Sequence, residues 1–154
     1  MRKIAPIIAA VTVLALYGLD YLRDDSTISQ PSVHAPQTES AAVAGDRAIQ
    51  AAYENRQSDV QVEGAGRVVK VLPDDTEGSR HQKFILELAS GQTLLVAHNI
   101  DLAPRIPDLR EGDRVSFYGE YEWNERGGVV HWTHHDPQGR HVDGWLKHQG
   151  KRYQ

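Results

Sequence analysis

The sequence has no cysteine, which excludes a disulfide framework, a thiolate metal site and a cysteine nucleophile. It also has no excess of basic residues, because 17 Lys and Arg stand against 21 Asp and Glu, for a formal net charge of −4. That balance excludes a histone-like nucleic-acid binder but is compatible with a local basic face. The phosphate-cradling patterns GxxxxGK(S/T) and GxGxxG are missing, and no GxSxG motif marks a serine hydrolase.

What the chain does have at its N-terminus is a charge-free apolar run. Residues 4–19 carry no charged side chain and follow Arg2 and Lys3, as is typical of a signal peptide or signal anchor. No A-x-A site closely follows the run, so we expect an uncleaved signal anchor over residues 1–25, with the membrane as its partner. A cleaved signal peptide is the alternative. Both place the protein in the cell envelope, on the periplasmic or extracellular side, or outside the cell.

The rest of the chain divides into a linker and one folded domain. Residues 26–45 contain Ser, Thr, Gln, Ala and Pro without an apolar period, and we expect a flexible linker there. Residues 46–154 carry the hydrophobic patterns of a single β-barrel domain. This domain is expected to begin with a short helix that Asp46 caps.

After this helix the apolar pattern alternates with a period of two. The alternation predicts five strands, the first of which is bent at Gly64 and Gly66; the strands cover residues 60–71, 83–88, 93–98, 115–123 and 129–133. Residues 100–109 have helical spacing, but two prolines limit this link to a turn or two. Three strands, a helical link and two more strands is the order of a five-stranded Greek-key barrel of the OB type. A generic antiparallel sandwich is the alternative.

Several long strings in this part of the chain resemble a bacterial domain family of unknown function. They are HNIDLAPRI at residues 98–106, GEYEWN at residues 119–124 and HWTHHDP at residues 131–137. The resemblance covers about residues 58–154. It implies a small secreted or envelope barrel of OB-like fold, and it implies no particular activity.

The densest chemical feature is the histidine-rich stretch from His131 to Asp136. Neutral imidazoles and carboxylates are ligands of Zn-type ions. A bend before Pro137 would gather four candidate ligands for a divalent metal, namely His134, His135, Asp136 and His141. Such a site would serve a metal-dependent hydrolase of the phosphodiesterase or nuclease kind. The plainer interpretation is a set of polar histidines that hydrogen-bond to carboxylates or to the backbone.

Two further polar groups are candidates. Asn99 and Asp101 follow the third strand and are expected to cap the next turn, while Arg105 is spaced to pair with Asp101. A sharper interpretation is an anion pocket at the barrel mouth in which Arg105 recognises phosphate or carboxylate. Glu120 and Glu122 share one face of the fourth strand, which suits acid–base chemistry or, more commonly, an outward polar face.

The C-terminal part of the domain is basic and aromatic. Residues 125–154 hold five Lys and Arg against three Asp and Glu. A basic, aromatic face on an OB barrel binds single strands or oligosaccharides through stacking and charge. We therefore expect a binding module for an anionic polymer, either single-stranded nucleic acid or a glycan, with contacts from Arg105, Trp132, His134, His135, His141 and Lys147. The alternatives are the metal-dependent hydrolase and a structural envelope protein.

Overall fold

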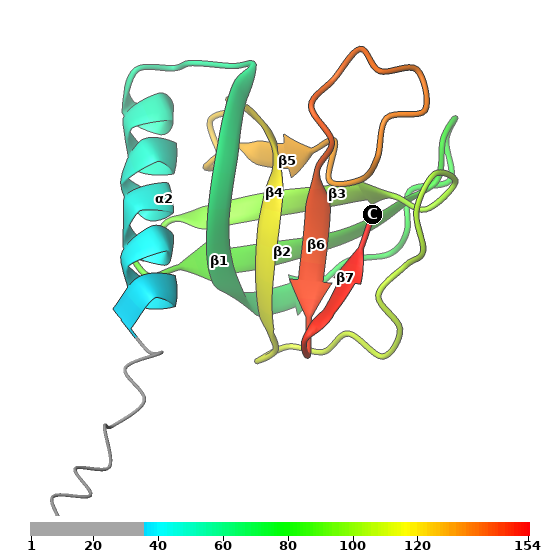
Figure 1. The fold of residues 1–154 in the computed structure, drawn as a ribbon, viewed down its shortest axis with the longest axis horizontal. Helices are drawn as coiled ribbons and strands as arrows, with labels where there is room; N and C mark the ends of the chain where they lie inside the picture. Colours follow the sequence, from blue (N-terminus) through cyan, green and yellow to red (C-terminus); the bar gives the residue numbers. More distant parts are fainter. Residues whose placement is uncertain (1–35) are drawn as a thin grey trace, which may run out of the picture. The chain divides into compact units, whose positions relative to one another are not determined.

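The computed structural model describes residues 36–154, which form a mostly β structure preceded by one helix (Figure 1). The anchor expected over residues 1–25 lies outside the described residues, as does the first part of the expected linker. Within residues 36–154, no helix has the length and apolar character needed to cross a membrane.

The helix, α2 (Pro36–Glu54), begins earlier than the sequence predicted. It starts at Pro36 rather than at Asp46, so the last part of the expected linker is helical. Proline is well suited to the first turn of a helix, where its missing N–H is not needed. Further along, Gly45 lies against the backbone of Glu63, and a Cβ at this position would overlap the Glu63 carbonyl oxygen. The glycine therefore allows the helix to pack directly on the first strand.

The strands form one seven-stranded sheet. They are β1 (Val60–Val71), β2 (His81–Leu88), β3 (Thr93–Asn99), β4 (Arg114–Glu122), β5 (Val129–His131), β6 (Trp145–His148) and β7 (Lys151–Tyr153). The order in the sheet is β1-β2-β3-β5-β4-β6-β7, and β1 also pairs with β4. This last pairing closes the first five strands into a barrel, so the predicted OB-like Greek-key barrel is confirmed and the open sandwich is excluded.

The barrel core follows the alternation that the sequence predicted. Inward side chains of β2, β3 and β4 are buried, among them Phe84, Val96 and Phe117, each 0% exposed. Helix α2 covers one end of the barrel, where its Ile49 is also 0% exposed. The indole Nε1 of Trp123 donates a hydrogen bond to the carbonyl of Tyr53 and so attaches the β4–β5 turn to this helix.

The segment of residues 100–109 covers the opposite end of the barrel (Figure 1) and contains turns rather than the predicted helical link. Its Ile106 is 1% exposed and packs in the core. The buried side chain of Gln82 holds Ile106 by accepting from its backbone N–H (2.8 Å) and donating to its carbonyl (2.9 Å). Pro104 and Pro107 lack the N–H groups that a helix needs, so this segment does not form a helix. The hydrogen bonds from the Gln82 side chain to the Ile106 backbone take the place of helical ones.

The C-terminal hairpin extends the sheet beyond the barrel. β5 ends at His131 instead of Thr133, and a loop leads to β6, which pairs with β4. Gln149 and Gly150 join β6 to β7 with positive φ angles of 48° and 80°, as a tight two-residue hairpin turn requires. The sequence did not predict this pair of strands.

Candidate functional site

Three ligand-type side chains meet on the outer face of β4 and β5. Glu120 lies directly opposite His131 in the antiparallel register, and Glu122 lies two residues further along β4 on the same face. The Nε2 atom of His131 is 3.6 Å from Glu120 Oε1 and 3.7 Å from Glu122 Oε1. One ligand atom from each residue lies within 4.8 Å of the other two. The two glutamates thus form the outward polar face that the sequence predicted, with Tyr121 buried behind them.

The next residue, Trp132, ends the strand with a left-handed backbone. Its φ of +50° is an unusual conformation for a bulky side chain and needs support from its surroundings. The indole stacks flat on His141, with ring centroids 3.7 Å apart and planes 13° from parallel. His141 Nδ1 in turn lies 3.3 Å from Glu120 Oε2. Trp132 and His141, both predicted as ligand contacts, therefore support the carboxylate of Glu120 from the side.

The loop after Trp132 is organised by carboxylates rather than by a metal-type cluster. Asp136 accepts hydrogen bonds from the backbone N–H groups of Gln138, Arg140 and His141. These bonds, with that from Gln138 the strongest influence, lower the pKa of the Asp136 carboxyl to about 2. The carboxylate therefore stays ionised at all physiological pH values and fixes the loop.

The other predicted ligands in this loop face different partners. His134 is buried, and its Nδ1 is 2.8 Å from the carbonyl of His135. His135 is exposed, and its Nδ1 is 2.7 Å from Asp143. Asp143 also accepts from the backbone N–H of Asp136, and this bond and the one to His135 lower the pKa of Asp143. The four residues predicted to share a metal do not bring their ligand atoms together; in the described part of the chain, Glu120, Glu122 and His131 do so instead.

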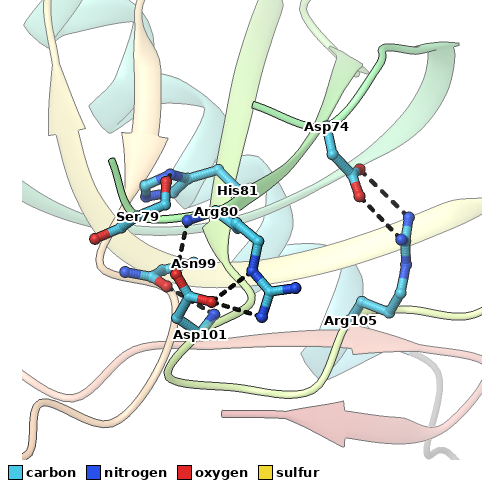
Figure 2. Close-up of polar contacts among 7 residues, drawn as sticks. All are labelled: Asp74, Ser79, Arg80, His81, Asn99, Asp101 and Arg105. Carbon is cyan, nitrogen blue, oxygen red and sulfur yellow. Dashed lines mark hydrogen bonds and ion pairs between the residues drawn. The ribbon is translucent and has the colours of Figure 1, made fainter. Parts of the chain in front are cut away.

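Figure 2 shows the polar group at the barrel end that residues 100–109 cover. Arg105 pairs with Asp74 through its two terminal guanidinium nitrogens, Nη1 and Nη2, at 2.9 and 3.4 Å. It does not pair with Asp101, the partner that its spacing in the sequence suggested. Asp101 binds Arg80 instead, accepting from the Arg80 backbone N–H (2.8 Å) and Nε (2.7 Å), and these bonds lower its pKa. Asn99 accepts from the Asp101 N–H, as expected of a residue that caps this turn, whereas the Asp101 carboxylate binds Arg80 and does not cap the turn. The guanidinium that the anion-pocket interpretation assigned to phosphate or carboxylate thus contacts a carboxylate of the chain itself.

Between these two regions lies His98, which is 0% exposed. Its Nε2 is 3.1 Å from the carbonyl of Pro104 and its Nδ1 is 2.8 Å from the Thr133 hydroxyl. A carbonyl accepts only, so Nε2 carries the proton and Nδ1 accepts from Thr133. Burial lowers the pKa of His98 to about 4, despite the opposing effect of the Pro104 carbonyl. His98 is therefore neutral at pH 7. It links β3 to the segment of residues 100–109 and to the loop that follows β5.

A second surface feature is a groove of about 550 Å³ between the N-terminal half of α2 and the outer faces of the sheet. Three cations line it from neighbouring strands: Arg114 on β4, Lys147 on β6 and Arg152 on β7. Trp145 lies beside them, with Tyr118 stacked on it at 6.3 Å and the Arg152 guanidinium 4.6 Å from its ring centroid. We call this surface, formed by these five residues, the cationic groove.

Of the predicted ligand contacts, Lys147 lies in the cationic groove, Trp132 and His141 lie beside Glu120, and Arg105 lies at the covered barrel end. The sequence interpretation missed Arg114 and Arg152, because it did not predict β7 or the pairing of β6 with β4. It weighed Glu120 and His131 separately, because the register that joins them is a property of the folded sheet. The signal in the sequence that could have found this site is the alternation of Glu with aromatic residues on β4.

In the comparison with protein families, a family model matches residues 33–154. The matching family is described as a protein of unknown function (DUF3465). The comparison with curated proteins finds no match.

Proposed function

Because the chain belongs to the DUF3465 family, whose function is unknown, we propose a function from its own surface: the domain binds a single-stranded nucleic acid in the cationic groove. The observation that carries this proposal is the set of cations. Arg114, Lys147 and Arg152 make no ion pair with any residue in the described part of the chain, and the three lie together along one groove. Unpaired cations on a rigid sheet are available to phosphates at little cost in conformational entropy.

The sheet register places these cations next to one another. Lys147 is the cross-strand partner of Arg152 on β7 and of Ser116 on β4. Arg114 is two residues from Ser116 on the same face of β4. Direct and diagonal neighbours in a sheet lie roughly 5–8 Å apart. A row of charges with this spacing fits a polymer with a repeated anionic group better than a single small anion.

The aromatic side chains favour nucleic acid over other polyanions. Tyr118, Trp145 and Arg152 form a stacked ladder whose last member is a planar guanidinium. Unpaired bases stack on aromatic rings and on guanidinium planes, which sulfate and carboxylate groups of a glycan do not. The lining holds one acidic residue, Glu63, so the charge of the groove wall is positive although the whole chain carries −4.

The other functions considered from the sequence have less support. A hydrolase built on His134, His135 and Asp136 would need these ligand atoms to converge, and they face separate partners. A structural protein would bury an apolar surface against its neighbour, whereas this groove is lined mainly by charged and small residues. If the expected envelope location holds, incoming DNA is the relevant single strand.

The test is fluorescence anisotropy of a labelled oligo-dT with the full chain, in non-ionic detergent, over a range of KCl concentrations. Three phosphate contacts predict a slope of about −2 for log K against log salt, because each contact to a single strand contributes about −0.7. Lys147→Ala and Arg152→Ala should each weaken binding and reduce the slope by about 0.7. Lys70→Ala is the matched control, because Lys70 is equally exposed on β1 but does not line the groove.

Equal effects of Lys147→Ala and Lys70→Ala would show that binding depends on net charge and would refute the site. A sulfated polysaccharide is the competing ligand in a parallel titration. If it binds with the predicted sensitivity to Lys147 and oligo-dT does not bind at low salt, the groove recognises a glycan and the nucleic-acid proposal is wrong.

A further inference from the structure

The cluster of Glu120, Glu122 and His131 contains a buried polar atom with no partner. The Nε2 atom of His131 is inaccessible to solvent and makes no hydrogen bond. The nearest carboxylate oxygens, at 3.6 and 3.7 Å, are both beyond hydrogen-bond distance. An imidazole nitrogen that lies between two carboxylates and bonds to neither is unusual, since buried polar groups are nearly always satisfied.

The spacing of these atoms is that of ligands around one ion. Two ligands that each lie about 2.1 Å from a tetrahedral metal are about 3.4 Å apart. The observed separations of the two glutamate oxygens from His131 Nε2 are 3.6 and 3.7 Å. At the same ligand–metal bond length, they correspond to a ligand–metal–ligand angle slightly wider than the tetrahedral one. Two of the three separations therefore fit a single ion, and the third, between the two glutamates, is no more than 4.8 Å.

The charge of the cluster also calls for a cation. Glu120 and Glu122 are 18% and 31% exposed at their side chains and share one face of the strand. No Lys or Arg in the described part of the chain forms an ion pair with either. Two facing carboxylates repel each other in this partly buried setting, and a divalent ion would remove that repulsion.

A second unpaired atom lies on the same row of the sheet. Gln61 on β1 is the direct cross-strand partner of Glu120, which is the direct partner of His131 on β5. Its Nε2 is buried and has no hydrogen-bond partner. Three buried side-chain atoms lack a partner in the described part of the chain, and two of them belong to this row of three residues. The donor of Gln61 can bond to a metal ligand or to water bound at an open metal position.

We infer that Glu120, Glu122 and His131 bind a divalent first-row transition metal ion, with Zn²⁺ as the best-fitting probe. One imidazole and two carboxylates supply three protein ligands and leave a position open to solvent. Ca²⁺ is disfavoured, because it takes six to eight oxygen ligands and this site presents a nitrogen. His141 acts as a positioning residue: it contacts the second oxygen of Glu120 and is held by its stack on Trp132.

This site is separate from the one predicted from the histidine-rich string. Glu120 lies on the same face of β4 as Tyr118, two residues earlier, so the metal would lie on the face of the sheet that carries the Tyr118–Trp145 stack. The inference does not rest on nucleic-acid binding, and the metal experiment below contains no nucleic acid.

The test is calorimetric titration of Zn²⁺ into the full chain, without an affinity tag, after the protein has been stripped with a chelator. The wild type should bind one Zn²⁺ per chain. His131→Gln and Glu122→Gln should each weaken that binding at least about 100-fold, and His141→Gln about 10-fold. The matched controls are His135→Gln and Glu111→Gln, which remove an exposed imidazole and an exposed carboxylate elsewhere.

A second measurement separates loss of metal from loss of fold. Zn²⁺ should raise the urea midpoint of the wild type and of both controls, and it should leave the midpoints of His131→Gln and Glu122→Gln unchanged. Co²⁺ substitution should give the visible absorption of a low-coordinate site in the wild type and in both controls, but not in His131→Gln or Glu122→Gln. The inference is overturned if the stripped wild type takes up no Zn²⁺, or if uptake survives in both ligand variants. Loss of binding in His135→Gln alone would also overturn it and would place the metal in the loop.

Discussion

The buried imidazole of His98 predicts a specific acid sensitivity of the fold. The side chain is 0% exposed and is held neutral between the Pro104 carbonyl and the Thr133 hydroxyl. Its pKa in the folded protein is about 4, against 6.5 for an exposed histidine. Between these two values the unfolded chain binds a proton that the folded chain does not. The free energy of unfolding must therefore fall as the pH is lowered from 6.5 towards 4.

The size of this effect follows from the two pKa values. A difference of about 2.5 units corresponds to about 3 kcal/mol when the pH reaches 4. At pH 5 the loss is already about 2 kcal/mol, since the unfolded histidine is almost fully protonated there. A small domain has a total stability of roughly 5–15 kcal/mol, so this single group accounts for a measurable share. The depressed pKa values of Asp101, Asp136 and Asp143 act at lower pH, because these carboxylates lose their stabilising contacts only as they are protonated.

The assay is urea unfolding of the wild type and of His98→Gln at a series of pH values between 7.5 and 4.5. Glutamine does not titrate, so the variant should be less stable at pH 7.5 but should lose about 2 kcal/mol less than the wild type on going to pH 5. His135→Gln is the control: it removes an exposed histidine and should keep the wild-type pH dependence that His98 provides. If the wild type and His98→Gln lose the same free energy over this range, His98 is not the buried neutral group described here.

Three other substitutions test the packing. Ile49→Ala should lower the free energy of unfolding by roughly 2–5 kcal/mol in urea, because this α2 side chain is 0% exposed in the barrel core; an unchanged midpoint would separate α2 from the domain. Gly144→Ala should cost about 2–3 kcal/mol in thermal unfolding, because the new Cβ would overlap the Trp132 carbonyl, and a neutral result would contradict the close approach of this loop to β4. Arg105→Ala should cost less than about 1 kcal/mol, since its ion pair with Asp74 is 52% and 27% exposed; a larger loss would give this pair a structural role.

The barrel strands could be predicted from the sequence because each has a strong alternating pattern. In β2 and β4, inward Phe84 and Phe117 alternate with outward residues that are mostly polar, and this pattern survives any error in the exact bounds. Helix α2 was predicted too short, because Val43 is the one large apolar residue in residues 36–45, and a single such residue marks no buried face. β6 and β7 have four and three residues, too few for a period of two to be recognised.

The candidate site shows a different limit. A ligand set on a sheet is made from residues two apart on one strand and a residue opposite them on the next, as Glu120, Glu122 and His131 are. The register that brings them together depends on the length of the β4–β5 turn and on the pairing of whole strands. One sequence does not reveal it. A local cluster such as HWTHHDP is visible at once, but closeness in sequence does not make imidazoles converge.

The histidine-rich string is better explained by the shape of its loop. Asp136 accepts from the backbone N–H of Arg140, and Asp143 contacts both the backbone N–H of Asp136 and the exposed imidazole of His135. These contacts close the loop between β5 and β6. The loop returns His141 to the face of Trp132, whose left-handed backbone turns its indole towards it. Through the hydrogen bond from the His141 N–H to Asp136, this loop holds one imidazole beside Glu120. On this argument, replacing a loop carboxylate such as Asp136 should impair the proposed metal site indirectly, through the position of His141, and should affect it less than loss of His131 itself.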